Sequence, residues 1–325
     1  MNKTAEAQAE AAGRALEALI TKTIKNSGLP FKIYTLLFEC SVNSVSDYGS
    51  EVWGYENREA VSKIHLRAAR CFLGLPKHAT SAGVMAEVNW PLPVYRAQVN
   101  MVRQFFRVAR MDESRLTKQI CIWDLEFAKQ NDIQTWSSEI ENILLSNNLS
   151  LYFNYNLKFC VKPVISNLQE SLFVKQSVDL KTLCLSKPKL RTFVLFKEFG
   201  AVPSYLTMPM SFLARKYVAL TRLSNLAIRQ ETGRFERPRL EEKDRLCPTC
   251  SDRVSVENEL HVLFSCLTYT ELRQAWMKKI TIPDDFSRLD SPEKLKIVLN
   301  YAINVKFTAQ FIIDLYNKRS KIINS

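Results

Sequence analysis

The chain has 325 residues, of which 46% are hydrophobic and 10% aromatic, a composition typical of globular proteins and not of disordered ones. No stretch approaches the roughly eighteen uninterrupted apolar residues of a membrane-spanning helix, and residues 1–14 lack the apolar region of a secretory signal. Eight glycines are few for this length, which argues against glycine-rich phosphate loops and favours long helices. We therefore expect an intracellular protein, nuclear or cytoplasmic, whose cysteines stay reduced.

The positive charge of the chain is concentrated in its second half. The formal net charge is +12, and residues 1–150 carry 17 Lys and Arg against 16 Asp and Glu, whereas residues 151–325 carry 28 against 17. A strongly basic region favours a polyanionic partner, most simply RNA or DNA. An anionic membrane surface and a merely solvated basic surface are the alternatives that charge alone leaves open. Glycine motifs of nucleotide-binding loops are absent, and we expect neither a membrane partner nor a small-molecule substrate.

Most of the chain is predicted to be helical, because apolar residues recur at intervals of three and four between turn signals. The clearest example is residues 93–110, where Val99, Val102 and Phe106 share one face. Between residues 151 and 185 helix is favoured, with a strand as the alternative at 152–158. In chain order, the expected helices are 4–26, 31–45, 57–73, 80–88, 93–110, 114–130, 132–145, 211–230, 269–280, 291–301 and 306–318.

The predicted helix over residues 211–230 is amphipathic. Its apolar face carries Leu213 and Tyr217, and three arginines spaced seven residues apart form a basic ridge that we expect on the opposite, solvent-facing side. In the following loop, residues 232–239, arginines flank Phe235, a combination suited to phosphate contact and base stacking. The candidate nucleic-acid-binding residues are Arg215, Arg222, Arg229, Arg234, Phe235, Arg237, Arg239 and Arg245.

A group of cysteine and histidine residues has the spacing of a metal site. Cys247 and Cys250 are separated by two residues, ten residues then precede His261, and four more precede Cys266. Two thiolates on one tight turn can bind an ion from the same side, and the later His and Cys complete a tetrahedron. We predict that these four residues bind a structural Zn²⁺ ion. The alternative is a buried helix with incidental core cysteines, which the polar residues around Cys247 and Cys250 argue against.

Six short motifs carry a resemblance to a known family. They are DYGSEVWG (47–54), IHLR (64–67), FLGLP (72–76), RQETGRF (229–235), LCPTC (246–250) and ELHVLFSC (259–266). The first three resemble the thumb and connector region that follows the polymerase core in LINE-type non-LTR retrotransposon reverse transcriptase proteins. The last three resemble the C-terminal Cys-Cys-His-Cys segment of the same family. The motifs stand in the family's order and span about residues 5–275, although residues 130–205 match only loosely.

The resemblance implies an RNA- and DNA-binding protein that copies element RNA at a nicked target. It also implies that the Cys-Cys-His-Cys segment binds zinc and helps to hold nucleic acid. The sequence departs from the family where catalysis is concerned, because a polymerase needs paired aspartates that hold two magnesium ions on a strand hairpin. The adjacent aspartates Asp284 and Asp285 follow Pro283, which cannot donate to a strand ladder. We therefore expect no enzymatic activity and interpret the chain as a remnant or partial product without the palm and endonuclease.

These observations predict a mainly α fold, with a helical bundle followed by a helical C-terminal module that contains a zinc knuckle. The predicted parts are a thumb- or connector-like domain (1–150), a basic helical domain (151–240), the zinc module (241–280) and C-terminal helices (281–325). The leading hypothesis for function is a zinc-stabilised nucleic-acid-binding fragment. The alternative is a helical protein–protein interaction scaffold braced by a structural zinc, which salt-dependent polyanion binding would distinguish from the first.

Overall fold

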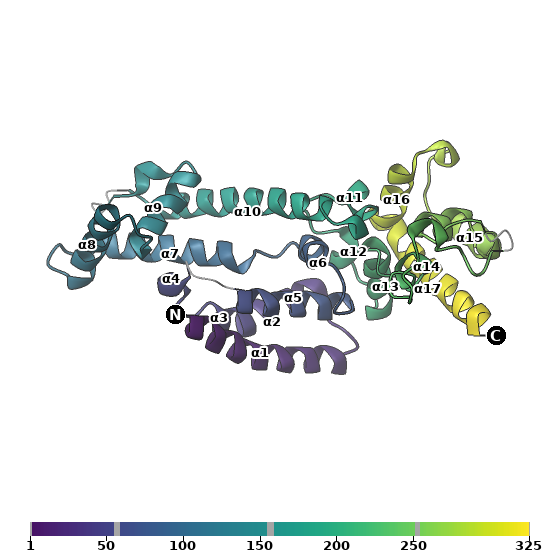
Figure 1. Cartoon of the computed structure of the whole chain (residues 1–325), viewed down its shortest axis with the longest axis horizontal. Helices are drawn as coiled ribbons and strands as arrows, with labels where there is room; N and C mark the ends of the chain where they lie inside the picture. The colour runs from purple at the N-terminus through teal and green to yellow at the C-terminus, as the bar shows by residue number, and fades with distance from the viewer. Residues whose placement is uncertain (1, 55–58, 155–158, 251–253, 325) are drawn as a thin grey trace. The chain divides into compact units, whose positions relative to one another are not determined.

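The computed structural model describes residues 2–54, 59–154, 159–250 and 254–324. Helices account for the regular structure of these residues, which contain no strand and one isolated antiparallel bridge, between Leu246 and Val256 (Figure 1). The predicted mainly α fold is therefore confirmed. Within the same residues, no helix combines the length and the apolar character that crossing a bilayer requires.

The chain forms two compact units, each assembled from separate segments. Unit 1 comprises Met1–Thr21, Leu36–Ala68 and Trp90–Asp179, and unit 2 comprises Lys22–Thr35, Ala69–Asn89 and Leu180–Ser325. These units cut across the predicted boundaries at 150, 240 and 280, because residues 22–35 and 69–89 pack with the C-terminal half. Contacts between segments that are distant in the sequence define the two units. The change in net charge near residue 150 does not coincide with a boundary between them.

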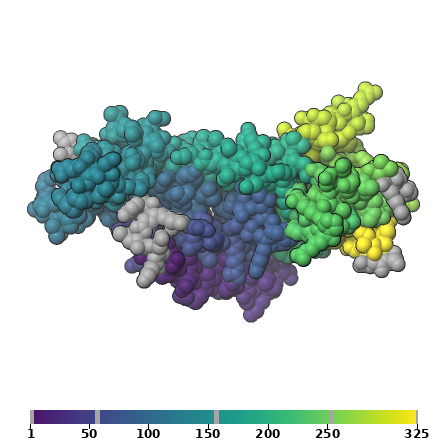
Figure 2. All heavy atoms as spheres, viewed as in Figure 1, coloured from purple at the N-terminus to yellow at the C-terminus, as the bar shows by residue number. Residues whose placement is uncertain are grey.

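Unit 1 contains most of the long helices of the first half of the chain. Its elements are α1 (Asn2–Lys25), η1 (Glu39–Asn43), α3 (Ser44–Ser46), α4 (Ser50–Trp53), α5 (Glu59–Leu73), α7 (Pro93–Ala109), α8 (Leu116–Asn131), α9 (Trp136–Ser146), η2 (Ser150–Tyr152) and α10 (Val161–Leu185), of which α1, α5 and α10 continue into unit 2. Helix α7 contacts α4, α8 and α9, and its predicted apolar face is buried, with Val99, Val102 and Phe106 between 0% and 6% exposed. In the space-filling view, the teal atoms of α8, α9 and α10 form one continuous surface (Figure 2).

The local signals of the sequence agree with several helix ends. Helix α1 ends at Lys25, where Gly28 has a φ of 102° and donates its N–H to Thr23 O at 2.9 Å, so the predicted stop is confirmed. Between residues 151 and 185, where helix was favoured, α10 forms; of the range 152–158, for which strand was the alternative, Tyr152 ends η2 and residues 153 and 154 belong to no helix or strand. Residues 155–158 lie outside the described residues, as do residues 57 and 58 at the start of a predicted helix.

Unit 2 is built around the last helix of the chain. Its elements are α2 (Phe31–Phe38), α6 (Ser81–Val88), η3 (Pro188–Leu190), α11 (Phe193–Phe196), α12 (Ser204–Thr207), α13 (Phe212–Arg222), α14 (Arg229–Thr232), η4 (Glu242–Asp244), η5 (His261–Ser265), η6 (Leu267–Tyr269), α15 (Thr270–Met277), η7 (Phe286–Arg288), α16 (Ser291–Leu299) and α17 (Ala302–Asn324), of which α2 continues into unit 1 from Leu36. Helix α17 contacts α12, α13, α15 and α16. Trp276 of α15 stacks on Phe311 of α17, with ring centroids 4.4 Å apart. This packing places the cysteine-rich segment against a long helix.

The predicted helix over residues 211–230 is shorter and rotated relative to the expectation. Helix α13 ends at Arg222, and the chain turns at Ser224, which has a φ of 51°, before α14 begins. Leu213, expected in the core, is 50% exposed, whereas Arg215 and Arg222, expected in solvent, are 4% and 1% exposed. The orientation predicted for this helix is therefore wrong.

Candidate metal centre

Short-range backbone contacts bring the four predicted zinc ligands together in unit 2. The N–H of Cys247 donates to Ser255 O at 2.8 Å, next to the bridge that closes the segment between them. The N–H of His261 donates to the side chain of Asn258 at 2.9 Å, and the N–H of Cys266 donates to His261 O at 2.7 Å. These bonds hold the backbone at Cys247, His261 and Cys266, three of the four predicted ligands.

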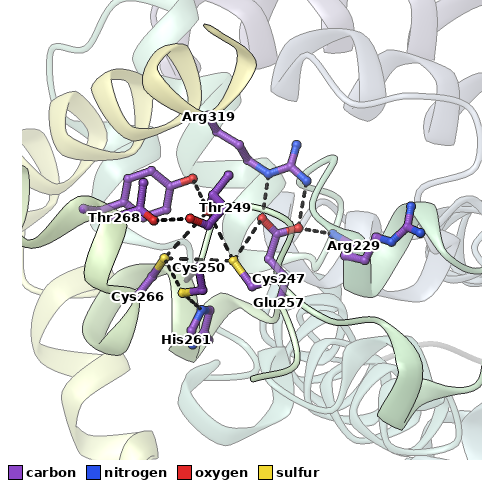
Figure 3. A network of polar contacts seen from close by, with 10 residues as sticks. Arg229, Cys247, Thr249, Cys250, Glu257, His261, Cys266, Thr268 and Arg319 are labelled. Atoms are coloured by element: carbon purple, nitrogen blue, oxygen red, sulfur yellow. Dashed lines mark hydrogen bonds and ion pairs between the residues drawn. The ribbon is translucent and has the colours of Figure 1, made fainter. Parts of the chain in front are cut away.

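The ligand atoms of all four residues converge on one point. Cys250 Sγ lies 3.3 Å from His261 Nε2 and 3.2 Å from Cys266 Sγ, and Cys247 Sγ lies 4.0 Å from Cys266 Sγ (Figure 3). All four ligand atoms lie within 4.8 Å of one another. Zinc–sulfur bonds of about 2.3 Å in a tetrahedron place neighbouring sulfurs about 3.8 Å apart. The separations therefore suit a divalent ion at the centre of the cluster.

The chemistry of the thiols also fits a cation. The sulfurs are free and lie well beyond the disulfide bond length of about 2.0 Å. The hydrogen bond between Cys247 and Cys266 lowers the pKa of Cys266 to about 7 and, together with burial, raises that of Cys247 to about 11. The thiols therefore compete, because a thiolate at Cys266 disfavours a second thiolate at Cys247. A divalent cation would remove this competition by stabilising every thiolate at once.

The three cysteines are buried, at 1%, 4% and 0% exposure, and polar neighbours contact them. Thr249 Oγ1 lies 3.3 Å from Cys247 Sγ and 3.4 Å from the hydroxyl of Tyr269. Arg273 donates to Cys266 O at 2.7 Å and so anchors the last ligand to α15. Thr249 could have been found from its place within the Cys-Pro-Thr-Cys turn. Tyr269 and Arg273 lie in the continuation of the second group of family-like motifs.

Glu257 links the cluster to two distant parts of unit 2. Its side chain is fully buried and accepts two hydrogen bonds of 2.7 Å from Arg319 of α17, one on each carboxylate oxygen. It also accepts a hydrogen bond from the backbone N–H of Arg229 and approaches Cys247 Sγ at 3.9 Å (Figure 3). Sequence reasoning missed Glu257 and Arg319 because 62 residues separate them and neither belongs to a recognisable motif.

Two of the arginines predicted to contact nucleic acid stabilise the interior of unit 2. The guanidinium of Arg215 lies 4.0 Å from the centre of the Phe72 ring and donates to Phe72 O and to Leu29 O. Arg222 donates to the buried carboxylate of Glu87 and to Leu299 O at 3.0 Å. The predicted solvent-facing ridge is therefore wrong at these two positions, because both side chains are buried against acceptors far away in the sequence: backbone carbonyls for Arg215 and the Glu87 carboxylate for Arg222.

The carboxylate that pairs with Arg222 is part of a buried ionic cluster. Tyr205 donates its hydroxyl to Glu87 at 2.8 Å, and Lys197 Nζ lies 3.9 Å away. Burial raises the pKa of Glu87, but the charges of Arg222 and Lys197 and the hydrogen bonds from Arg222 and Tyr205 outweigh it and lower the pKa. Burial also lowers the pKa of Lys197 to about 8. The cluster is an internal ion pair with no access for a polyanion.

The remaining candidate nucleic-acid residues differ in accessibility. Arg245 is 4% exposed, and Arg229 is half-buried and paired with Glu236. Arg234 is half-buried and lies 3.3 Å from a carboxylate oxygen of Glu231. The residues of this set that face solvent are Phe235, which is 65% exposed, Arg237 and Arg239. The loop after α14 therefore retains the exposed basic and aromatic side chains that the sequence predicted.

The described residues define a mainly α protein with a buried Cys₃His cluster that can hold a metal ion, compatible with zinc. No family model matches the chain, and searches of curated proteins and of solved structures found no match either.

Proposed function

We propose that this chain is a zinc-stabilised nucleic-acid-binding protein, corresponding to the non-catalytic C-terminal region of a LINE-type non-LTR retrotransposon reverse transcriptase. The observation that carries the proposal is the convergence of Cys247, Cys250, His261 and Cys266, whose spacing is that of the family's Cys-Cys-His-Cys segment. Four protein ligands leave no open position on a tetrahedral zinc, so the proposed role of the metal is structural. No catalytic step is assigned to this chain.

Charge and exposure support the proposed partner. Residues 151–325 carry the excess of positive charge, and the loop after α14 presents Arg237, Arg239 and Phe235 to solvent. Arginines bind phosphates, and an exposed aromatic ring can stack on a base. The metal centre follows this loop within ten residues, so metal binding would order the segment that carries the contacts.

Metal content and a salt titration together test the proposed function. Purified protein should contain about one zinc per chain and should bind single-stranded RNA or duplex DNA with an affinity that falls steeply as salt rises. Fluorescence anisotropy of labelled RNA and DNA between about 50 and 200 mM salt measures this dependence. Absence of RNA and DNA binding at the lowest salt concentration would contradict the proposal, whatever the zinc content.

An apolar stripe on α8 favours a second candidate, a protein–protein interaction scaffold braced by the metal. Leu116, Ile120, Trp123 and Phe127 recur at helical spacing and are 69%, 51%, 58% and 37% exposed. Trp123 and Phe127 stack on each other with ring centroids 5.0 Å apart. Exposed apolar patches of this kind mark interaction surfaces. Under this second function, the chain would associate with a protein through α8 and show no affinity for RNA or DNA.

A further inference from the structure

A pocket in unit 2 is lined by four arginines that come together from separate segments. Its volume is about 330 Å³, at the lower end of the range of ligand pockets, about 300–1,000 Å³. The charged residues that line it are Arg191, Arg234, Arg239, Arg245, Glu241 and Glu242. The arginines outnumber the glutamates by two, so the pocket has a net positive charge.

Arg245 forms the fixed part of this pocket. Its side chain is 4% exposed, and its guanidinium donates to Leu240 O at 2.9 Å and to Gln230 O at 3.0 Å. No carboxylate forms an ion pair with it among the residues that the structure describes. Burial lowers the pKa of Arg245, and the positive charges of Arg234 and Arg239 lower it further. Its hydrogen-bond partners are thus neutral carbonyls, and the negative charge of Glu242, which also lines the pocket, offsets only part of the combined positive charge of the four arginines.

The other arginines are only partly neutralised. Arg234 Nε is buried and has no hydrogen-bond partner in the described chain, although an oxygen of Glu231 lies 3.3 Å away. Arg191 lies 3.6 Å from Glu242, beyond ordinary hydrogen-bond length. Arg239 is exposed and forms no ion pair with any described carboxylate. Repulsion between four nearby cations is therefore relieved when an anion enters the pocket.

We propose that this pocket binds a phosphate group. Guanidinium groups match the geometry of phosphate oxygens and bind them through paired, charge-assisted hydrogen bonds. Arg234, Arg239 and Arg191 supply the accessible donors, and the buried Arg245 supplies a fixed charge. The inference deepens the proposed function and rests on it for the source of the phosphate, which would be the backbone of an RNA or DNA strand. The ring of Phe235 does not line this pocket; it packs edge-on against His78, and its exposed part can stack on a base of the bound strand next to the pocket.

The test uses zinc-loaded full-length protein, the variants Arg234→Gln and Arg239→Gln, and Arg288→Gln as a matched control. Arg288 is an exposed arginine of unit 2 that does not line the pocket. Isothermal titration calorimetry with inorganic pyrophosphate at low salt measures the affinity of the pocket for phosphate groups directly. Each pocket variant should weaken pyrophosphate binding by about tenfold, and the control should change it by less than about twofold. Because Arg239 is exposed, its variant is expected to keep the fold.

The salt dependence of the affinity for labelled single-stranded RNA is the second measurement. Loss of one phosphate contact should lower the slope of log affinity against log salt by about 0.7 in Arg239→Gln and leave it unchanged in Arg288→Gln. The phosphate pocket is overturned if pyrophosphate fails to bind, or binds Arg239→Gln as tightly as the control, even where RNA still binds. If pyrophosphate binding depends on the pocket but RNA and DNA do not bind, the pocket stands and the proposed nucleic-acid function fails.

Discussion

The substitution Glu257→Gln should weaken the packing of the metal module, the segment of residues 241–280 that carries the Cys₃His cluster, against α17. Glu257 is fully buried and receives both hydrogen bonds of the Arg319 guanidinium, as well as one from the backbone of Arg229. Glutamine has nearly the same shape, but it carries no charge and presents an NH₂ group where one carboxylate oxygen now accepts. One donor therefore loses its acceptor, and the charge of Arg319 is left without a counter-ion.

The magnitude follows from burial. The side chains of Glu257 and Arg319 are 0% and 10% exposed, so solvent can replace little of what is lost. Removing one partner of such a buried pair costs about 3–5 kcal/mol. An exposed ion pair in unit 1 provides the matched control, because Glu59 and Lys63 are 67% and 71% exposed and Glu59→Gln should cost below about 1 kcal/mol.

Hydrogen–deuterium exchange resolves the two units separately and is the appropriate measurement. In Glu257→Gln, residues 229–250 and the second half of α17 should exchange about 100-fold faster or more, since each 1.4 kcal/mol corresponds to a factor of ten. Exchange in unit 1 should not change. Unaltered protection in both regions of unit 2 would refute the view that this buried pair holds the metal module against α17.

Two further predictions concern the metal and pH. Cys247→Ala should abolish zinc binding in metal analysis. It should also remove exchange protection over the described part of residues 240–280 while unit 1 stays protected, because structural zinc contributes on the order of 10 kcal/mol to local folding. Retained protection of residues 240–280 would contradict a structural role of the metal. Because the pKa of Glu87 is lowered in the folded state, its stabilising contribution is present above its unfolded pKa of about 4.3 and is lost as pH falls through the folded pKa. Thermal melts of wild type and Glu87→Gln should therefore differ near neutral pH and converge in acid; a constant difference would count against this role of the pair with Arg222.

Local rules predicted much of the helical structure because helices depend on nearby residues. The apolar periodicity of residues 93–110 corresponds to α7, and the sequence around Gly28 marks the end of α1. The spacing of the cysteines and histidine also predicted their clustering, since two of the ligands share one turn, His261 begins η5 and Cys266 directly follows it. For these features, the interacting groups lie within about twenty residues of one another.

Orientation and pairing across long distances could not be predicted in the same way. The orientation predicted for α13 from its amphipathic pattern depended on the arginines facing water. Arg222 instead binds the carboxylate of Glu87, 135 residues away in the sequence. The sequence near position 222 contains no signal that predicts Glu87 as the acceptor. Arg191 was likewise passed over, because its place beside Arg245 depends on how the chain folds back.

The amino-acid sequence alone determined that the chain is mainly helical and that four side chains have metal-ligand spacing, because both properties depend on short-range periodicity and turns. Only the tertiary structure decided which arginines are buried and which line the pocket beside Arg245. The physical reason is that burying a charge requires a compensating group, and here that group comes from distant parts of the chain, as with Arg222 and Glu87.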